Sequence, residues 1–490
     1  MDHFSSSGEY LFPESLHGRK VLLATESIGP INGVSRTTTS LIQYLQQHGV
    51  DVKIVAPHYV GDKSRPPLPV GPVRRLGGLS LPYSPELSVA YPFRLDRISA
   101  RFKPDLVYLA SPASVGFQAM LQMRCFTDPA PVIANFQTDL SAYSEIIFPA
   151  PLDRYAVWML QVVQGYLFSH RSVQTIFYPS SPIANYLVEA GVQKDKLMHL
   201  GRGVDTSVFN PEFRDERYRR QLAPKGEIIL LCVGRLAPEK GFGFLAKAAI
   251  RLAEQKLPFK LVIVGGNRNV AVENEVRSYF TPIRDRVIFT GFLEGAHLAR
   301  AYASADVFCH CSITETFGLV VLEAMACGLP VVARNEGGPS EIVRHQTTGF
   351  LIEPENLDAF VAHTKLLASD PSLREEMSTA GRVTAEHTTW EKINNRVAWR
   401  IVEAIEQHEN SHEPQFQFQS QILNWIYALG ATVLVEMRLT GAMLLVSCFW
   451  VWAVFPLMVH GNTVFRGARK AATELSVMNP ISGGMSRPSH

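Results

Sequence analysis

Short hydrophobic runs alternate with amphipathic stretches over roughly the first 180 residues, a pattern that predicts strands separated by helices. The first run is followed by a Gly-Pro-x-Asn-Gly turn and a helix at about 35–48. Because the runs are hydrophobic throughout, both faces of each strand should be covered, as in a parallel α/β sheet. The strands predicted from this series are Lys20–Ala24, Val52–Ala56, Asp105–Ala110, Pro131–Asn135 and Thr175–Tyr178.

A second series of the same kind begins at Glu227. Two such series predict an α/β protein with two Rossmann-like, doubly wound domains that face a cleft. Ligands of such sheets bind at the carboxyl ends of the strands, where the strand order reverses. The strands predicted from the second series are Ile228–Val233, Lys260–Val264, Arg286–Phe289, Val307–His310 and Pro330–Ala333.

The domain organisation follows from these two series and from the polar stretches around them. The segment 201–225 is polar and contains two prolines, so it is interpreted as the interdomain hinge. The predicted parts are an N-terminal tail at 1–18, an acceptor domain at 19–205, a donor domain at 206–388, a closing helix at 389–406, a linker at 407–420, a membrane anchor at 421–465 and a polar tail at 466–490.

Composition excludes several classes of protein. The 490 residues include 47 Lys+Arg against 45 Asp+Glu, and the net charge of +2 excludes a nucleic-acid binder built on gross basicity. Six scattered cysteines form no disulfide framework, which favours a reducing compartment. Cys309-His310-Cys311 has no second Cys/His pair at zinc spacing, so both thiols are expected to be buried.

The C-terminal part of the chain is unusually hydrophobic. Leu439–Val459 contains 21 residues without a charge, enough to cross a bilayer of ~20 residues per span. Ile422–Val435 is a second apolar run, and a hairpin with Glu436 and Arg438 at its turn would return the basic tail to the cytosol. A single crossing and an interfacial approach helix are the alternatives. Since the N-terminus shows no signal-peptide pattern, the catalytic domains are expected on the cytosolic face of a membrane.

Two loops at predicted strand ends carry residues suited to phosphate. Gly29–Val34 ends a strand and opens a helix, where glycines allow close approach and the helix N-terminus favours negative charge. An ordinary βα turn would look the same. Arg235 and Lys240 flank the loop after the strand at 228–233, and two cations at a sheet's carboxyl edge suit a diphosphate.

The stretch Glu315–Ala326 is the densest in candidate chemistry. Backbone amides of Phe317, Gly318 and Leu319 would open a helix and could hold phosphate oxygens. Glu315 and Glu323 could accept hydrogen bonds from hydroxyl groups, which suits a sugar and a ribose better than a metal. Glu323 lies in the apolar run LVVLEAMA, so its carboxylate needs a partner.

At these residues the sequence resembles the retaining glycosyltransferases of GT-B fold, family 4, and within them the GDP-mannose-dependent α-mannosyltransferases and the sulfoquinovosyl-diacylglycerol synthases. The resemblance covers roughly residues 19–400. It rests on Asn32-Gly33-Val34, SPASVG at 111–116, NFQTDLSAY at 135–143, YPSSPIANYL at 178–187, RGVDTSVFNP at 202–211, GRLAPEKGF at 234–242, VGG at 264–266, TGFLEGAHLARAYASADVF at 290–308, ETFGLVVLEAMACGLPVVA at 315–333 and EGGPSEIV at 336–343.

The resemblance implies a nucleotide-sugar donor, GDP-mannose in preference to a UDP-sugar, and a membrane lipid or glycolipid acceptor. Arg235 and Lys240 would bind the diphosphate, and Glu323 the ribose. Glu315 and the amides of Phe317, Gly318 and Leu319 would contact the transferred hexose and phosphate, while the Gly33 loop would close over the diphosphate. No metal or other cofactor is expected, because cations and helix dipoles neutralise the leaving diphosphate.

One position departs from the family pattern. The family usually has a histidine near the reacting carbon, where this chain has Gln137. Glutamine can hydrogen-bond a sugar hydroxyl but cannot exchange a proton near neutral pH. Asp139 is the nearest carboxylate that could share this catalytic work, and an ordinary loop acid is an equal interpretation. A nucleotide-sugar-binding protein without turnover therefore remains an alternative to a transferase. A GT-B enzyme that does not transfer glycosyl groups, such as a nucleotide-sugar epimerase, is a further alternative.

Overall fold

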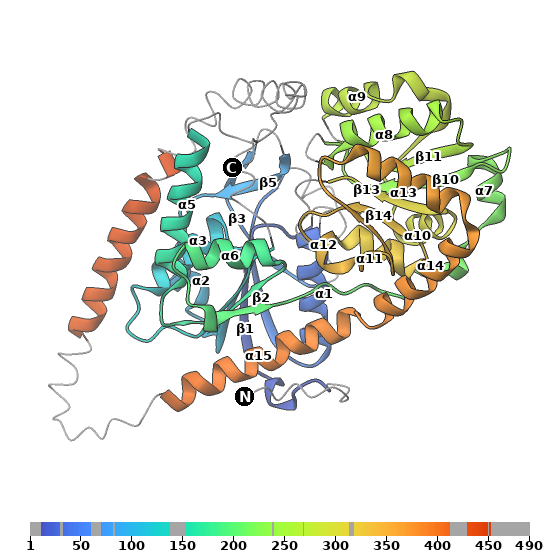
Figure 1. Cartoon of the computed structure of the whole chain (residues 1–490). Coiled ribbons are helices and arrows are strands. Elements are labelled where there is room, and N and C mark those ends of the chain that lie inside the picture. The colour runs from blue at the N-terminus through green and yellow to red at the C-terminus, as the bar shows by residue number, and fades with distance from the viewer. Residues whose placement is uncertain are drawn as a thin grey trace, which may run out of the picture. The chain divides into compact units, whose positions relative to one another are not determined.

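The computed structural model of the chain (Figure 1) describes residues 11–29, 33–59, 70–81, 84–137, 152–237, 240–267, 269–312, 318–411, 429–448 and 450–451. The chain divides into two compact units. The N-terminal domain contains residues 14–177, 183–198 and those from 400 onward, and the C-terminal domain contains residues 178–182 and 199–399. Each domain has its own parallel sheet, as the alternating hydrophobic runs predict.

The N-terminal domain is built on a seven-stranded sheet with the order β3-β2-β1-β6-β7-β8-β9. The strand order runs one way from β1 and the other way from β6, so the topological switch point lies between these two strands. The strands are β1 (Lys20–Thr25), β2 (Asp51–Pro57), β3 (Val73–Leu76), β6 (Leu106–Ala110), β7 (Val132–Asn135), β8 (Val173–Tyr178) and β9 (Leu197–His199).

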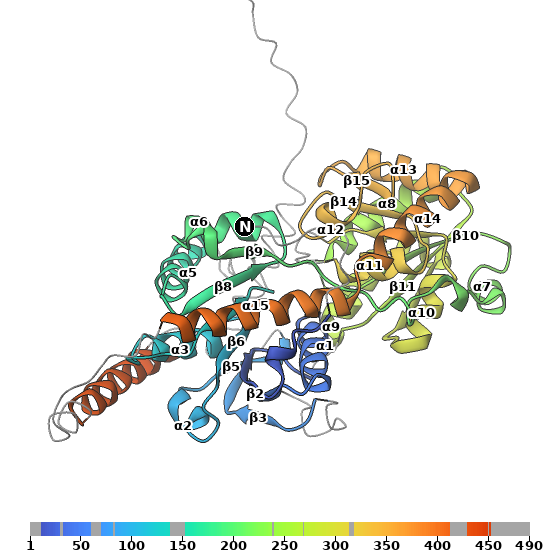
Figure 2. The ribbon, with the colours of Figure 1, turned by 90° about the horizontal axis from the view of Figure 1, so that it is seen from below.

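Helices follow most of these strands, and a separate antiparallel hairpin lies in the sequence between β3 and β6. Figure 2 shows the C-terminal half of α15 alongside β8. The hairpin strands are β4 (Gly78–Leu81) and β5 (Ser84–Ala90), and the helices are α1 (Gly33–Gln47), α2 (Leu95–Ser99), α3 (Ser114–Met123), α5 (Leu152–Phe168) and α6 (Ser181–Glu189). The helix α15 (Trp390–Ser411) belongs to this domain from residue 400 onward.

The C-terminal domain has a six-stranded sheet with the order β12-β11-β10-β13-β14-β15, and its switch point lies between β10 and β13. Its strands are β10 (Ile228–Val233), β11 (Phe259–Val264), β12 (Val287–Gly291), β13 (Val307–His310), β14 (Val331–Arg334) and β15 (Gly349–Ile352). Its helices are α7 (Glu216–Leu222), α8 (Phe242–Glu254), α9 (Val270–Ser278), α10 (Gly295–Ala303), α11 (Leu319–Ala326), α12 (Pro339–Ile342), α13 (Leu357–Ser369) and α14 (Pro371–Glu386).

Two hydrophobic clusters cover the two faces of this second sheet. Leu230 and Cys232 of β10 belong to one cluster, and Ile229 and Leu231 belong to the other. Successive side chains of a strand point to opposite faces, so a strand with both faces covered must be hydrophobic throughout. This is why the run at 228–233 shows no polar alternation.

The thiols predicted to be buried lie in this core. Cys309 and Cys311 are each 1% exposed and belong to the same cluster as Cys232. Burial raises the pKa of the Cys232 thiol to about 12, so it stays protonated near neutral pH. In the part of the chain that the structure describes, no group of three His, Cys, Asp or Glu side chains is placed to hold a metal ion.

Carboxylates hold both ends of β1. At its amino end, Asp105 accepts a hydrogen bond from the backbone N–H of Lys20 at 2.7 Å. Just after its carboxyl end, Glu26 accepts hydrogen bonds from the first amides of α3, including that of Val115 at 2.5 Å, and from the Ser114 hydroxyl at 2.8 Å. Burial raises the pKa of Glu26 to about 7 in spite of these contacts.

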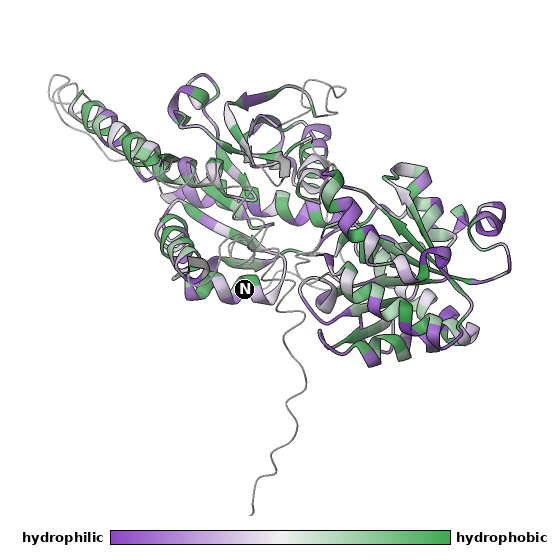
Figure 3. Ribbon diagram, turned by 90° about the horizontal axis from the view of Figure 1, so that it is seen from above, coloured by the Kyte–Doolittle hydropathy of each residue, from purple (hydrophilic) through white to green (hydrophobic). Residues whose placement is uncertain are grey.

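A helix from Leu429 to Cys448 in the N-terminal domain has a mean hydropathy of 1.6 (Figure 3). Among the described residues it alone is long and apolar enough to span a membrane. Glu436 and Arg438 lie inside this helix, so the turn expected at these residues is wrong. The Glu436 carboxylate accepts a hydrogen bond from the Arg94 guanidinium at 3.1 Å, which compensates its charge without a turn. The remainder of the expected hairpin, 422–428 and 452–459, lies outside the described residues, as does the basic tail.

The raised pKa of Glu26 predicts a pH-dependent stability. Since the folded-state pKa of about 7 lies above the ordinary value of 4.5, the free energy of unfolding should fall as pH rises from about 4.5 to about 7. The Glu26→Gln variant has no ionisation there, so its unfolding free energy should fall less over that range. Urea unfolding of both proteins at pH 5 and pH 8 measures the difference, and parallel pH dependences would contradict this assignment.

Candidate active site

The loop that carries Arg235 leaves β10 at the switch point of the C-terminal sheet. The backbone N–H of Gly234 donates to the Val264 carbonyl at 3.0 Å, and that of Leu236 donates to the Gly266 carbonyl at 3.2 Å. These contacts fix the backbone on both sides of Arg235, and Arg235 itself is exposed. A preorganised backbone with an exposed guanidinium is suited to an anionic ligand.

The other end of this loop, Lys240 and Gly241, abuts the chain that leaves β13. Gly241 has φ +72°, and a Cβ at this position would lie 1.8 Å from the Cys311 carbonyl oxygen. Only glycine fits there, which brings Lys240 close to the segment after β13. The Lys240 charge lies near enough to the Cys232 thiol to oppose the effect of burial on its pKa.

Gly318 and Leu319 form the start of α11, the helix that follows β13. Gly318 is the N-cap with φ +71°, and a glycine has no side chain that could cap the helix itself. The Gly318 carbonyl accepts from the amides of Val321 at 2.9 Å and Leu322 at 3.2 Å, so within the helix the amides of Leu319 and Val320 are the ones that need acceptors from elsewhere. Because β10 and β13 are neighbours in the sheet, this helix start and the Arg235–Lys240 loop leave adjacent strand ends.

Glu323, one turn into α11, is 2% exposed. Its Oε2 accepts a hydrogen bond from the Tyr302 hydroxyl of α10 at 2.9 Å. The expectation that a carboxylate in this apolar run has a polar partner is confirmed. The Tyr302 ring is itself fixed by an edge contact with Phe209 and a tilted contact with Phe308, with ring centroids 5.7 Å apart in each case. The carboxylate thus has a defined orientation.

In the N-terminal domain, Gly33 is the first residue of α1 and Gln137 lies two residues beyond β7. Two strand spacings separate β1 from β7 in the sheet, or roughly 10 Å. Gln137 is 3% exposed, and its Oε1 has no hydrogen-bond partner among the residues that the structure describes. A buried amide oxygen without a partner is costly, so this position is suited to a ligand that donates a hydrogen bond.

The structure thus places Arg235, Lys240, Gly318 and Leu319 at one switch point, with Glu323 inside the helix that starts there. Three further predicted site residues, namely Asp139, Glu315 and Phe317, lie outside the described residues.

Two residues near these loops were not predicted from the sequence. Tyr302 of α10 orients Glu323 from 21 residues earlier in the chain, and no local pattern connects the two. Glu26 did have a signal, because it is a carboxylate placed directly after a buried strand. That position alone indicated that it would lie at the carboxyl edge of the sheet.

Comparison with known proteins shows to which family the chain belongs. Residues 31–208 match the domain described as Glycosyltransferase Family 4, and residues 213–384 match the one described as Glycosyl transferases group 1. The chain is 33% identical to the GDP-mannose-dependent alpha-mannosyltransferase of Mycobacterium tuberculosis, over 68% of this chain and 84% of that protein. The chain belongs to the family 4 glycosyltransferases.

Further similarities agree with this assignment. Sulfoquinovosyl transferase SQD2 of Arabidopsis thaliana is 30% identical to this glycosyltransferase, over 79% of this chain and 74% of the relative. The crystal structure of Anabaena HepE in complex with UDP-glucose superposes with a TM-score of 0.59 and 20% identity, over 78% of this chain and 99% of that one. The protein is a hexosyltransferase that uses a nucleotide-sugar donor, and each of its domains has the parallel α/β architecture typical of the GT-B fold.

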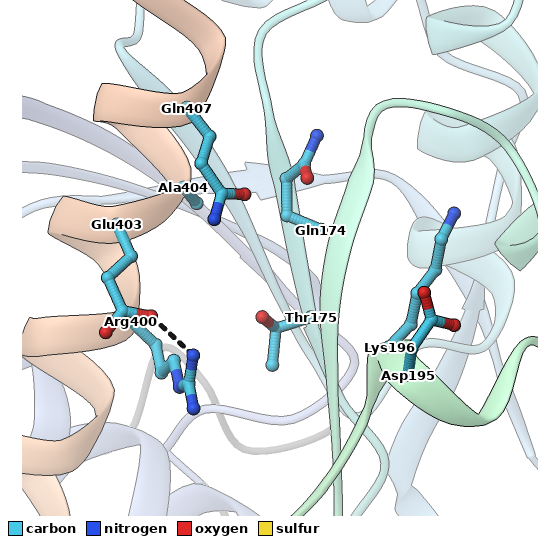
Figure 4. Close-up of a pocket in the computed structure, with 8 residues that line it drawn as sticks. All are labelled: Gln174, Thr175, Asp195, Lys196, Arg400, Glu403, Ala404 and Gln407. Atoms are coloured by element: carbon cyan, nitrogen blue, oxygen red, sulfur yellow. Dashed lines mark hydrogen bonds and ion pairs between the residues drawn. The ribbon is translucent and has the colours of Figure 1, made fainter. Parts of the chain in front are cut away.

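A separate cavity of about 280 Å³ lies in the N-terminal domain of the glycosyltransferase (Figure 4). None of the predicted site residues lines it. Arg400 and Glu403 of α15 form an ion pair within it, and Asp195 lies beside Lys196, so its charges are matched internally. An anionic donor would find no excess of positive charge there. The lining residues are Gln174, Thr175, Asp195, Lys196, Arg400, Glu403, Ala404 and Gln407.

The Tyr302–Glu323 contact predicts the effect of a single hydroxyl. Tyr302→Phe keeps the packed ring but removes a partner of a buried carboxylate, which should lower the free energy of unfolding by about 1–3 kcal/mol. Tyr218→Phe, whose ring in the same domain packs beneath Arg300, is the matched control and should change stability by less. Urea unfolding of the two variants makes the comparison, and equal losses would show that the hydrogen bond to Glu323 contributes nothing specific.

Proposed function

We propose that this glycosyltransferase transfers mannose from GDP-mannose, with retention of anomeric configuration, to a membrane-borne lipid or glycolipid. The observation that carries the donor half of the proposal is the meeting of Arg235, Lys240 and the glycine N-cap of α11 at one switch point. The similarity to a GDP-mannose-dependent enzyme over most of that enzyme's length supports the choice of nucleotide and sugar.

The proposed chemistry is departure of the nucleoside diphosphate from the anomeric carbon, followed by attack of an acceptor hydroxyl on the same face. Arg235 and Lys240 stabilise the negative charge that develops on the leaving group, together with the amides at Gly318 and Leu319. Glu323 accepts hydrogen bonds from the ribose hydroxyls. Glu315, Phe317 and Asp139 retain their proposed roles around the hexose. These cations and amides supply the charge stabilisation that a metal provides in other transferases.

Gln137 has the role of orienting the sugar in this proposal. Its buried amide oxygen can accept a hydrogen bond from a hexose hydroxyl. That oxygen has no hydrogen-bond partner among the described residues, so the sugar would satisfy it. A reaction led by leaving-group departure requires no proton transfer at this position. The absence of the usual histidine is therefore compatible with turnover.

The acceptor half of the proposal rests on the helix Leu429–Cys448. Its inner face packs on the N-terminal domain, where Leu439 and Ala442 are at most 5% exposed. Its outer face carries exposed Met437, Leu444 and Leu445, each at least 64% exposed. Because Glu436 is held by Arg94 at the domain surface, this helix is better suited to lie in the membrane interface than to cross the bilayer. The domain would then work on the cytosolic face beside its lipid acceptor.

A UDP-sugar-dependent glycolipid synthase is the second candidate, because the sulfoquinovosyl transferase of Arabidopsis thaliana is similar over a comparable length. A nucleotide-sugar-binding protein without turnover would share the donor loops and differ only in rate.

Donor specificity is tested by incubating the purified full-length protein with GDP-mannose and UDP-sugars in the presence of a membrane-lipid extract. We expect a mannosylated lipid with GDP-mannose, and transfer from a UDP-sugar alone would select the second candidate.

Arg235→Ala should weaken binding of the nucleoside diphosphate by roughly tenfold or more, since it removes a charge-assisted contact worth ~1.5–3 kcal/mol. Glu315→Gln should keep that affinity but lose about two orders of magnitude in turnover. Binding of the donor without turnover by the wild type would indicate a pseudo-enzyme.

Membrane association is tested by truncation after Ser411, which keeps α15 whole, including Glu409 and its ion pair with Arg19 at 2.6 Å. The truncated protein should leave the membrane fraction, retain binding of the nucleoside diphosphate and lose most activity on a lipid acceptor.

Extraction of the full-length protein with alkaline carbonate distinguishes an interfacial helix from one that crosses the bilayer. Release is expected for an interfacial helix, and retention would indicate a crossing.

A further inference from the structure

The switch point of the N-terminal sheet contains a carboxylate to which neither the family assignment nor the proposed mechanism gives a role. β1 and β6 are neighbours, with Thr25 opposite Ala110 in the register. Glu26 directly follows β1, and the chain after β6 enters α3 at Ser114. The crevice where the two chains diverge is the place at which α/β sheets bind their ligands. Here the Glu26 side chain bridges it.

Four hydrogen bonds form this bridge. Glu26 Oε1 accepts from the backbone amides of Ala113 at 3.1 Å, Val115 at 2.5 Å and Gly116 at 3.2 Å, and Oε2 accepts from the Ser114 hydroxyl at 2.8 Å. The first amides of a helix have no acceptor within the helix. The N-cap residue of α3, Ala113, has no side-chain oxygen to offer. A carboxylate from the neighbouring loop therefore caps this helix and complements its dipole.

Two further contacts hold the loop after β1 next to this bridge. Two residues beyond Glu26, the Ile28 carbonyl accepts a hydrogen bond from Arg75 at 3.0 Å. One residue further, the Gly29 amide donates to the Ser35 hydroxyl of α1 at 2.8 Å. The loop is thus anchored at Glu26, Ile28 and Gly29, immediately before the segment that ends at Gly33.

We propose that Glu26 is a positioning residue for glycosyl transfer: by capping α3 across the switch point, it fixes residues 26–29, from which the chain continues to Gly33, the residue proposed to contact the donor diphosphate. The inference rests on the proposed role of Gly33 but not on the choice of donor base or sugar. Glu26 acts through the loop backbone and touches no reacting atom.

The alternative is that Glu26 only stabilises the fold, and the chain offers a matched control for this. Asp105 accepts from the Lys20 amide at 2.7 Å at the opposite end of the same strand. It also pairs with Arg19 at 3.8 Å. Asp105→Ala removes a carboxylate that holds β1, but at the edge away from the loops. Its effect on stability should resemble that of Glu26→Ala without an effect on the loop.

The test compares Glu26→Ala, Glu26→Gln and Asp105→Ala in the full-length protein. Hydrogen exchange reports the loop directly, and Glu26→Ala should speed exchange of the amides at 27–29 and 113–116 by about tenfold or more, the scale of one lost charge-assisted hydrogen bond. The affinity for GDP and UDP should fall in parallel. Glu26→Gln should stay within about threefold of wild type, because its carbonyl oxygen can accept from the same amides while its amide group donates to Ser114.

Asp105→Ala should leave the exchange at 27–29 and the nucleotide affinity unchanged. Equal effects of Asp105→Ala and Glu26→Ala would overturn the proposal, as would a Glu26→Gln variant as defective as Glu26→Ala. Should Glu26→Ala not fold, Glu26→Asp replaces it, since a side chain shorter by one methylene loses its reach to the amides. Both readouts are independent of turnover, so a wild type that transfers no sugar would refute the proposed function and leave this comparison intact.

Discussion

The amides at the start of a helix that follows a parallel strand need acceptors, and this requirement organises both domains. At each switch point two such helix starts lie side by side at the carboxyl edge of the sheet. In the N-terminal domain the requirement is met internally, because Glu26 caps α3 from the neighbouring loop. In the C-terminal domain the corresponding helix, α11, begins at a glycine that has no side chain to serve as a cap. Similar topology thus gives one switch point at which a carboxylate of the chain caps the second helix, and one at which a glycine begins it.

The difference between the two switch points agrees with a division of labour. Arg235 and Lys240 bring two positive charges to the C-terminal switch point, and the close approach of Gly241 to the Cys311 carbonyl holds their loop against the neighbouring strand end. The sequence between β1 and α1, residues 26–32, contains no Lys or Arg, and the Glu26 carboxylate occupies the crevice instead. A nucleoside diphosphate would be attracted by the two cations of the C-terminal loops. Electrostatics therefore favours the C-terminal domain as the donor domain, as the family resemblance implies.

Hydrophobic patterning predicted the fold because both sheets are covered on both faces. The runs at 228–233 and 307–310 coincide with β10 and β13, since every side chain in them except that of His310 belongs to or packs against one of the two cores. Short peripheral strands such as β9 and β15 carry only three or four residues and gave no comparable signal. The buried state of Glu323 was predictable from its apolar neighbours, whereas its partner Tyr302 was not, because a contact between two helices leaves no local pattern.

The helix Leu429–Cys448 shows where a turn predicted from charged residues is wrong. Glu436 and Arg438 interrupt two apolar runs, and a charged pair in such a place usually indicates a turn in water. The structure instead continues the helix through both residues, because Arg94 on the domain surface supplies a partner for Glu436. A helix held by a surface ion pair near its middle cannot place that residue at the centre of a bilayer without breaking the pair and burying a charge. The same contact that removes the turn therefore favours a helix that lies flat, with its apolar outer face toward the lipid and the N-terminal domain directly above it.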